Sequence, residues 1–281
     1  MDATAAAIGE YREDASMELK SAEVQKFQVG TLKLEIHPDA PAAGAAAANA
    51  IAELMLHLKG KLKNIGAIFA TGASQLQLLS TLTTISNLPW DQINGFHLDE
   101  YIGIDENHPA SFRRYLRENL TQRVPIGKFH EINGSAADPE LVCREYARKL
   151  KAADPQFCLL GFGENGHLAF NDPGEADFHD PEDVKVVHLD AVCRQQQASE
   201  GWFHTLQDVP ERAITVTIPA IFRVPKLILT VPGKRKTEIT RRVLTEPISE
   251  ECPATIIRTH PDATVFLDRE AAAKLDGINF D

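Results

Sequence analysis

The sequence predicts an α/β fold in which short strands, most of them parallel, form one sheet covered by helices on both faces. Short apolar or β-branched segments alternate with helix-like segments along most of the chain, and glycine-rich turns follow several of the predicted strands. At 281 residues, 43% of them apolar and 25% charged, the chain can bury a substantial core. No internal repeat or low-complexity linker divides it, so we expect an N-terminal extension over residues 1–25 and a single domain over residues 26–281.

The first half of the chain starts this alternation. Residues 26–37 alternate apolar and polar side chains and predict one strand. Residues 42–59 are rich in alanine with an apolar spacing suited to a helix, and Pro41 lies just ahead of them, where proline is tolerated. Four further elements are then expected, in the order strand, helix, strand and helix, over residues 65–70, 76–82, 93–98 and 111–120.

The second half continues the pattern, with strands expected over residues 157–161, 184–189, 226–231 and 263–267. Helices are expected over residues 141–152, 192–206, 236–244 and 269–275. Strands joined through helices pair in parallel, because the helix carries the chain back across the sheet. We therefore predict a mainly parallel sheet in one domain, with room for a small flap.

The charge and the cysteines restrict the class of protein. A formal net charge of −11 argues against nucleic acid or an anionic membrane as a partner, since both require a concentrated basic surface. Residues 1–20 hold no apolar segment of a secretory signal, and no run reaches the length of a membrane span. The cysteines are widely spaced and predict buried free thiols: Cys143, Cys158, Cys193 and Cys252. Together these features predict a cytoplasmic protein that binds a small molecule.

A first glycine-rich turn, Ala70–Ser74, follows one predicted strand and precedes a helix. A helix N-terminus with a glycine and small hydroxyl groups, here Thr71, Gly72 and Ser74, suits a bound phosphate. The alternative is an ordinary strand-to-helix turn in which Ser74 caps the helix. The motif is short and is not a Walker sequence, so both interpretations stay open.

Two adjacent acids, Asp99 and Glu100, come just after the apolar strand over residues 93–98. Open α/β sheets bind ligands at the carboxyl ends of their strands, so a carboxylate here can move a proton on a bound substrate. The alternative is a capping or surface acid. Asp99 is the stronger candidate because it follows the strand directly, whereas Glu100 would point to the opposite side of an extended chain.

The most distinctive turn is LLGFGENGHLAFNDPG, over residues 159–174, which contains the GxGxxG spacing of a dinucleotide-binding loop. That interpretation requires a helix that opens at the third glycine, Gly166. The segment Asn171–Gly174 interrupts the chain within two turns and excludes such a helix. We therefore interpret this turn as part of a site for a small polar ligand.

His167 lies at the centre of that turn, with Glu164, Asn165 and Asp172 nearby. This surrounding suits a histidine that transfers a proton and is oriented by a neighbouring side chain. The alternative is a hydrogen-bonded structural histidine. No second histidine or cysteine lies at ligand spacing, so we expect no metal site.

Cations near two predicted elements complete the set of candidates. Arg194 lies near the start of a predicted helix, and Lys236 ends the run Lys234–Lys236 after a predicted strand. The default position for a lone lysine or arginine is the solvated surface. A cation at a strand-to-helix junction is nevertheless well placed to meet a phosphate, and a local cluster of cations lets an acidic protein bind an anion.

The segments ATGAS, LDEYIGIDENHPASF, LLGFGENGHLAFNDPG, CRQQQ and VPGKRK occur in this order along the chain. In this respect the sequence resembles the glucosamine-6-phosphate deaminase (isomerase) family, within the wider group that includes 6-phosphogluconolactonase, over residues 32–275. The combination of LDEY with GxGxxGHLAFN favours the deaminase branch. The resemblance implies a modified Rossmann-like three-layer sandwich without a bound nucleotide and without an essential cofactor. It also leaves room for a homo-oligomer, since subunit assembly is common in that family.

The resemblance implies conversion of glucosamine 6-phosphate, or a close epimer, and water to fructose 6-phosphate, or its epimer, and ammonia. It implies that His167 assists opening of the sugar ring and that Asp99 carries a proton between C2 and C1. Asn165 and Asp172 would support the histidine. The residues that would hold the phosphate are Thr71, Gly72, Ser74, Arg194 and Lys236.

Two positions depart from the pattern expected for this family. Many deaminases carry Asp where Asn165 stands and Glu where Asp172 stands. A carboxylate beside an imidazole favours the imidazolium, whereas a neutral amide does so far less. The departure leads us to expect a different aminosugar phosphate as substrate, such as the galacto epimer. The alternatives are a 6-phosphogluconolactonase, a non-deaminating sugar-phosphate isomerase, and a non-catalytic sugar-phosphate sensor.

Overall fold

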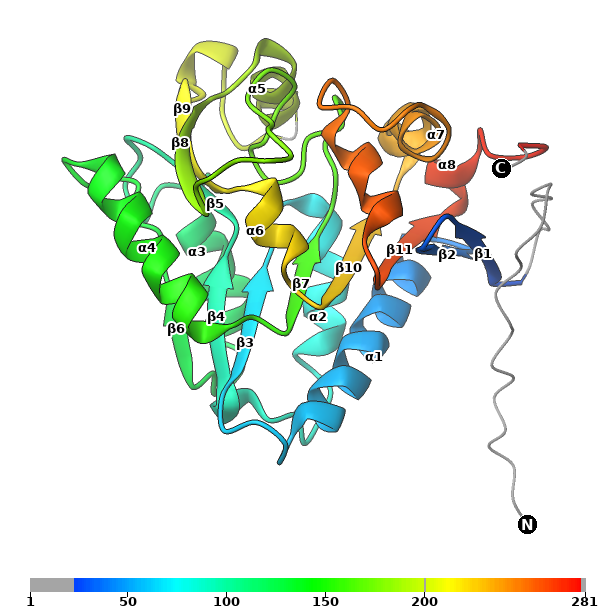
Figure 1. Cartoon of the computed structure of the whole chain (residues 1–281), viewed down its shortest axis with the longest axis horizontal. Helices are drawn as coiled ribbons and strands as arrows, with labels where there is room; N and C mark the ends of the chain where they lie inside the picture. Colours follow the sequence, from blue (N-terminus) through cyan, green and yellow to red (C-terminus); the bar gives the residue numbers. More distant parts are fainter. Residues whose placement is uncertain (1–22, 200, 279–281) are drawn as a thin grey trace.

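The structure, a computed structural model, describes residues 23–199 and 201–278 (Figure 1). Its centre is an eight-stranded sheet in which all neighbouring strands are parallel except β1 and β2 at one edge. In spatial order the strands are β1 (Gln25–Val29), β2 (Leu32–His37), β11 (Ala263–Asp268), β10 (Lys226–Val231), β7 (Phe157–Leu160), β3 (Ile65–Phe69), β4 (Ile93–His97) and β6 (Lys128–His130). The predicted α/β sandwich with a mainly parallel sheet is confirmed. Most of the extension expected over residues 1–25 lies outside the described residues.

Helices cover both faces of this sheet because its inner strands send alternate side chains into two cores. In β7, Phe157 and Leu159 join the core beneath two helices, whereas Cys158 and Leu160 join the core on the opposite face. The first pair of helices is α1 (Ala40–Leu58) and α2 (Leu76–Leu82). The opposite face carries α4 (Pro139–Ala153), α6 (Ile218–Phe222), α7 (Thr237–Thr245) and α8 (Arg269–Ala272).

Short elements complete the chain between these layers. The helix α3 (Phe112–Leu116) continues into a π-helical turn over Arg117–Thr121. The 3-10 turns are Ala73–Gln75, Trp90–Gln92, Leu206–Asp208, Lys234–Lys236 and Pro253–Thr259. Over residues 23–199 and 201–278, no helix combines the length and the apolar character needed to cross a membrane.

A second, three-stranded antiparallel sheet lies beyond the carboxyl ends of the central strands, at the top in Figure 1. Its strands are β5 (Asp99–Tyr101), β9 (Arg212–Val216) and β8 (Val184–His188), and α5 (Ala191–Ser199) accompanies them. The aromatic side chains of this layer form a separate core: Tyr101, Phe112, Phe170 and Phe203. The layer places α5 close to the loops that follow β4 and β7, where the predicted site residues lie.

Several expectations about individual elements are wrong. Residues 26–37 form the hairpin of β1 and β2, in which Gly30 adopts a positive φ of 61° at the turn. The apolar positions shift by one residue there, from Phe27 and Val29 to Leu32, Leu34 and Ile36. The helix expected over residues 192–206 ends at Ser199, and Gly201 follows with a φ of 83°. The strand expected over residues 184–189 belongs to the antiparallel sheet. The predicted elements do not include β5, β6 or β9. β5 and β6 have three residues each, which is too short for a clear pattern, whereas β9 has five residues, as many as β3.

Candidate active site

A cavity of ≈ 380 Å³ opens at the carboxyl ends of the central strands. A parallel sheet gathers loops from several strands at this edge, which is where such folds bind their ligands. All three glycine-rich segments of the sequence contribute to its wall. The polar and glycine residues of the wall include Thr71, Gly72, Ser74, Asp99, Gly161, Gly163, Glu164, His167, Gln196, Gln197, Gly233, Lys234, Arg235 and Lys236.

Two loops of the same construction flank β7 on either side of the cavity. Gly72, after β3, has a φ of 91°, and Gly233, after β10, has a φ of 92°. Glycine adopts this backbone conformation without the steric penalty of other residues. Each glycine precedes a 3-10 turn and then a helix, so the N-terminal ends of α2 and α7 face the same space. Two such ends form a suitable environment for an anion.

Buried hydrogen bonds hold the first of these loops in place. Tyr115 Oη donates to the backbone oxygen of Gly72 at 2.9 Å. Gln75 Nε2 donates to Ser74 Oγ at 3.1 Å and to Thr230 Oγ1 at 2.8 Å. Gly72 is the N-cap residue of the 3-10 turn, and no side chain caps it. The alternative that Ser74 caps the helix is therefore wrong, and Ser74 lies on the wall of the cavity.

The second loop carries the cations Lys234–Lys236, all of which line the cavity. Its backbone is held by an acid, because the N–H of Gly233 donates to Asp268 at 2.9 Å. Lys236 Nζ donates to the backbone oxygen of Phe162 at 2.9 Å. This bond joins the cationic loop to the glycine-rich turn after β7.

Asp99 is the first residue of β5 and lines the cavity with 7% of its surface exposed. Burial raises the pKa of the Asp99 carboxyl well above its usual range, and the charges of Glu100 and Asp172 raise this pKa further. Glu100 points to the opposite side of the strand, as expected. It is fully buried and accepts the backbone N–H of Arg113 at 3.1 Å and Arg113 Nε at 3.2 Å. Glu100 therefore stabilises the start of α3 and does not face the cavity.

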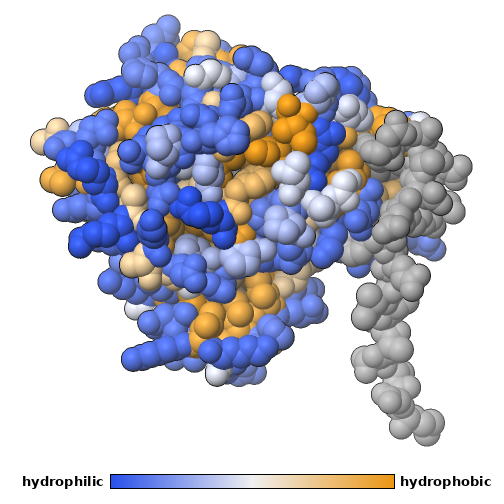
Figure 2. All heavy atoms as spheres, viewed as in Figure 1, coloured by the Kyte–Doolittle hydropathy of each residue, from blue (hydrophilic) through white to orange (hydrophobic). Residues whose placement is uncertain are grey.

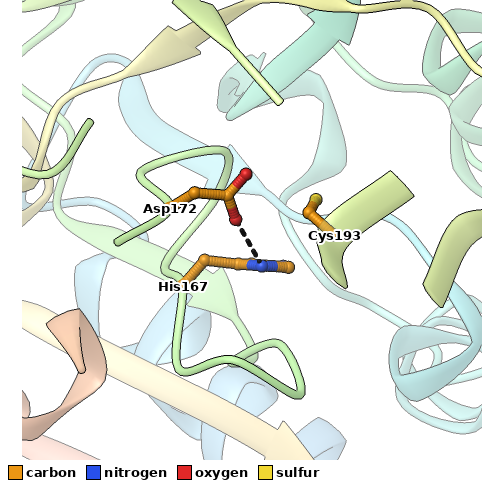
Figure 3. Close-up of side chains that lie close together, drawn as sticks. All are labelled: His167, Asp172 and Cys193. Carbon is orange, nitrogen blue, oxygen red and sulfur yellow. Dashed lines mark ion pairs between the residues drawn. The ribbon is translucent and has the colours of Figure 1, made fainter. Parts of the chain in front are cut away.

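His167 follows β7 on the glycine-rich turn, and its imidazole lies against Gly163. A Cβ atom at residue 163 would lie 2.1 Å from Cε1 of the imidazole, so a larger residue would displace the ring. Nδ1 of His167 lies 2.9 Å from Oδ1 of Asp172, a residue with no exposed surface (Figure 3). A carboxylate at Nδ1 keeps that nitrogen protonated and leaves Nε2 of the neutral imidazole as a proton acceptor.

Asn165 is not among the residues that line the cavity, but it forms a hydrogen bond with Asp172. Its Nδ2 donates to Asp172 Oδ1 at 3.0 Å and to Asp190 Oδ2 at 2.9 Å, while its Oδ1 accepts the backbone N–H of His167 at 3.0 Å. Burial alone would raise the pKa of Asp172, but its bonds to His167, Asn165 and the backbone of Asp190 outweigh burial and lower that pKa. The amide at residue 165 joins two carboxyl groups, which an ionised aspartate could not do.

Cys193, on α5, also belongs to this cluster, although the sequence contains no spacing that signals it. Ligand atoms of His167, Asp172 and Cys193 lie within 4.8 Å of one another, and no other such group occurs among the described residues (Figure 3). A metal would require the thiolate. Burial raises the pKa of the Cys193 thiol well above its usual range, and the charges of Asp172 and Asp190 raise it further. The thiol therefore belongs to the buried network around Asp172.

The structure corrects the expectation for Arg194. Its Nη2 donates to the backbone oxygens of Leu206 at 3.1 Å and Val209 at 2.9 Å, so the guanidinium ties α5 to the segment that follows it. Arg194 is not part of the cavity wall. Gln196 and Gln197 of the same helix do line the cavity, and neither is among the site residues predicted from the sequence.

Comparisons with known proteins agree with the motifs in the sequence. Residues 38–266 match the family model described as glucosamine-6-phosphate isomerases/6-phosphogluconolactonase. The glucosamine-6-phosphate deaminase of Bacillus cereus strain B4264 is 34% identical over 202 residues, which are 72% of this chain and 75% of that protein. The corresponding protein of Exiguobacterium sibiricum is 36% identical over 179 residues, 64% of this chain and 69% of that protein.

Solved structures show the same relationship. A protein described as a monomeric glucosamine-6-phosphate deaminase matches with a TM-score of 0.78 and 30% identity, over 85% of this chain and 98% of that chain. A 6-phosphogluconolactonase from Trypanosoma brucei matches with a TM-score of 0.73 and 17% identity, over 86% and 98% of the two chains. The second likeness concerns the fold alone.

Proposed function

The chain belongs to the family of glucosamine-6-phosphate isomerases and 6-phosphogluconolactonases, and we propose that within this family it is an aminosugar-phosphate deaminase. The proposed reaction converts glucosamine 6-phosphate, or an epimer, and water to a ketose 6-phosphate and ammonia. One observation carries the proposal: Asp99 and His167, from the ends of different strands, line one cavity beside two glycine loops. A proton-transfer pair next to a site for an anion is what isomerisation of a sugar phosphate requires.

We assign the phosphate end of the substrate to the two glycine loops. Thr71, Gly72 and Ser74 supply a helix end with hydroxyl groups, and Lys236 supplies a positive charge. Arg194 is left out of this set because its guanidinium is bonded to backbone oxygens. Arg235, on the wall of the cavity, is the cation that stands in its place.

The reaction starts from the closed sugar ring. Nε2 of His167 takes the proton from the hydroxyl group at C1 and delivers it to the ring oxygen, which opens the ring to the aldehyde. Asp172, 2.9 Å from Nδ1, keeps the imidazole in the required tautomer and stabilises the imidazolium that forms between the two transfers. This pair therefore needs no second histidine and no added cofactor.

Asp99 then moves a proton between two carbons. Its carboxylate removes the hydrogen from C2 as a proton, and the electrons of that bond form a C1–C2 double bond. The π electrons of the C1 carbonyl move to O1, which takes a proton from water, and the product is an enediol-type intermediate that bears the amino group. The carboxyl group returns the proton to C1 while the nitrogen forms a C2=N bond. Water adds to this imine and ammonia leaves, which gives the ketose phosphate. The raised pKa of Asp99 supports this role, because it makes the carboxylate a stronger base than a solvated aspartate.

The test measures ammonia and ketose phosphate together, from purified protein supplied with glucosamine 6-phosphate or galactosamine 6-phosphate. Equal amounts of the two products support the proposal. Because Asn165 and Asp172 depart from the pattern expected for the gluco-specific enzymes, we infer that the galacto epimer is the better substrate. A strong preference for the gluco epimer would contradict that inference without affecting the proposed reaction.

Two other functions would release no ammonia in this assay, and each has its own further signature. Hydrolysis of a lactone needs only the histidine and a water molecule, so a 6-phosphogluconolactonase would keep its activity when Asp99 is changed to Asn. A sugar-phosphate sensor would bind these substrates without turning them over. Either result would replace the proposed deaminase.

A further inference from the structure

The rim of the cavity holds an ion pair whose acidic partner has no role in the proposed reaction. Nε of Arg235 lies 2.7 Å from Oε1 of Glu164. Arg235 belongs to the cationic loop after β10, and Glu164 belongs to the turn after β7 that carries His167. Both residues line the cavity. The pair therefore connects the loop assigned to the phosphate with the turn assigned to proton transfer.

This ion pair is only partly shielded from water. The side chain of Arg235 is 49% exposed and that of Glu164 is 30% exposed. Ion pairs with such exposure contribute little net free energy, because water screens the charges and two long side chains lose rotamer freedom. A ligand that offers each partner a new opposite charge can therefore separate them.

Glu164 is the less buried of the two acids on the cavity wall, although its Oε1 atom, the one that faces Arg235, has less than 1 Å² of exposed surface. Among the described residues of its wall, the only acids are Asp99 and Glu164. Asp99 is almost fully buried, whereas Glu164 is partly exposed. The backbone N–H of Glu164 donates to Oε1 of Gln196 on α5 at 3.0 Å, and Gln196 is itself buried. This bond fixes the backbone of Glu164 while its side chain can change partners.

We propose that Glu164 and Arg235 exchange partners when an aminosugar phosphate binds. Glu164 then forms an ion pair with the ammonium group at C2, and Arg235 forms one with a phosphate oxygen. The inference rests on the proposed function, because an aminosugar phosphate carries both charges. In the empty cavity each side chain neutralises the other, and in the complex each pairs with the substrate. Glu164 then distinguishes aminosugar phosphates from sugar phosphates that lack an amino group, whereas Arg235 recognises the phosphate of both.

Sugar alcohols provide the test, because a substrate reduced at C1 cannot isomerise and its binding is measured without turnover. One probe is 2-amino-2-deoxyglucitol 6-phosphate, which carries both charges, and the other is glucitol 6-phosphate. For Glu164→Gln we expect about tenfold weaker binding of the amino probe. Binding of glucitol 6-phosphate should stay unchanged or become slightly tighter, because Arg235 no longer has to break its ion pair with Glu164. Arg235→Gln should weaken both probes by about tenfold.

Two further variants make the result specific. Glu164→Asp keeps the charge and should restore most of the preference for the amino probe. Glu238→Gln removes a carboxylate that pairs with Arg241 at 2.7 Å on α7, outside the cavity wall, and should bind both probes as the unmodified protein does. The exchange is overturned if Glu164→Gln weakens both probes equally or neither.

The two proposals can fail separately. An unmodified protein that prefers the amino probe through Glu164, yet releases no ammonia from any aminosugar phosphate, supports the exchange of partners and overturns the deaminase. A protein that releases ammonia while Glu164→Gln leaves the preference between probes unchanged supports the deaminase and overturns the exchange.

Discussion

Nδ1 of His167 lies 2.9 Å from Oδ1 of Asp172, and the same carboxylate oxygen accepts the amide of Asn165 at 3.0 Å. Asp172 is fully buried, so water cannot satisfy these donors if the carboxylate is removed. The orientation of the imidazole therefore depends on one buried acid and on the amide behind it.

Changing Asp172 to Asn should lower kcat by about 10²- to 10⁴-fold, because the wrong group then faces Nδ1 of His167. The free energy of unfolding should fall by about 1–3 kcal/mol at pH 7, since buried donors lose their acceptor. The folded-state pKa of Asp172 is lowered, so its contribution to stability is present above the ordinary aspartate pKa and is lost as the pH falls through the lowered value. Urea unfolding at pH 7 and at low pH tests this, and a difference that grows at low pH would contradict it.

Changing Asn165 to Asp should destabilise the protein by about 2–4 kcal/mol at neutral pH. The new carboxylate would replace two donated hydrogen bonds with repulsion from Asp172 and Asp190, at contacts of 3.0 and 2.9 Å. Such an aspartate would have a raised pKa, and the loss of stability should therefore grow as the pH rises. Thermal melts across pH 5 to 8 measure this trend. A variant that is as stable as the parent at pH 8 would show that this residue does not need an amide.

Changing Asp99 to Asn should lower kcat by about 10²- to 10⁴-fold while the melting temperature rises at pH 7. Burial raises the folded-state pKa of Asp99, so the ionised carboxylate reduces stability as the pH rises from the ordinary aspartate pKa through the raised value. The gain in the variant should therefore disappear at low pH. Calorimetric scans at pH 7 and at low pH measure the melting temperature, and ammonia release measures the activity.

In the unmodified protein, kcat/KM should fall on the acid side at a pH well above 4, because protonation of Asp99 removes the base.

Changing Gly163 to Ala should reduce kcat by at least about 10²-fold, because the new Cβ would displace the imidazole of His167 from 2.1 Å away. Gly161→Ala is the comparison, since its Cβ would lie no closer than 3.1 Å to another atom, the backbone oxygen of Thr230. We expect a much smaller loss there. Equal losses in the two variants would mean that contact with the imidazole is not the cause.

Changing Arg194 to Ala should lower the free energy of unfolding by about 1–3 kcal/mol and leave KM for the sugar phosphate within about twofold. Its Nη2 bonds to the backbone oxygens of Leu206 and Val209, so its loss loosens the segment after α5. Lys236→Ala should instead raise KM by about tenfold or more, because Lys236 lines the cavity. Steady-state kinetics and urea unfolding of both variants decide between these roles. A raised KM for Arg194→Ala would return it to the phosphate site.

The alternation of strands and helices could be predicted because each central strand is buried on both faces and reads as an apolar run. The prediction of one strand at residues 26–37 overlooks the turn, which is marked by Gly30 and by a shift of one residue in the apolar positions. The end of α5 at Ser199 could have been predicted from Gly201, because a glycine with a positive φ commonly follows the end of a helix. The short strand β5 forms because it pairs with β9, and the residues of β5 alone do not indicate a partner so distant in the sequence.

The sequence by itself determined the parallel sheet, the family and the residues that follow each strand, because these depend on the order of side chains along the chain. Only the tertiary structure decided which of those residues meet. It brings Asp190 and Cys193 to Asp172, directs Arg194 to backbone oxygens, and sets Arg235 against Glu164. Hydrogen bonds and ion pairs form over about 3 Å in space, so they depend on how distant segments pack and not on their separation in the chain.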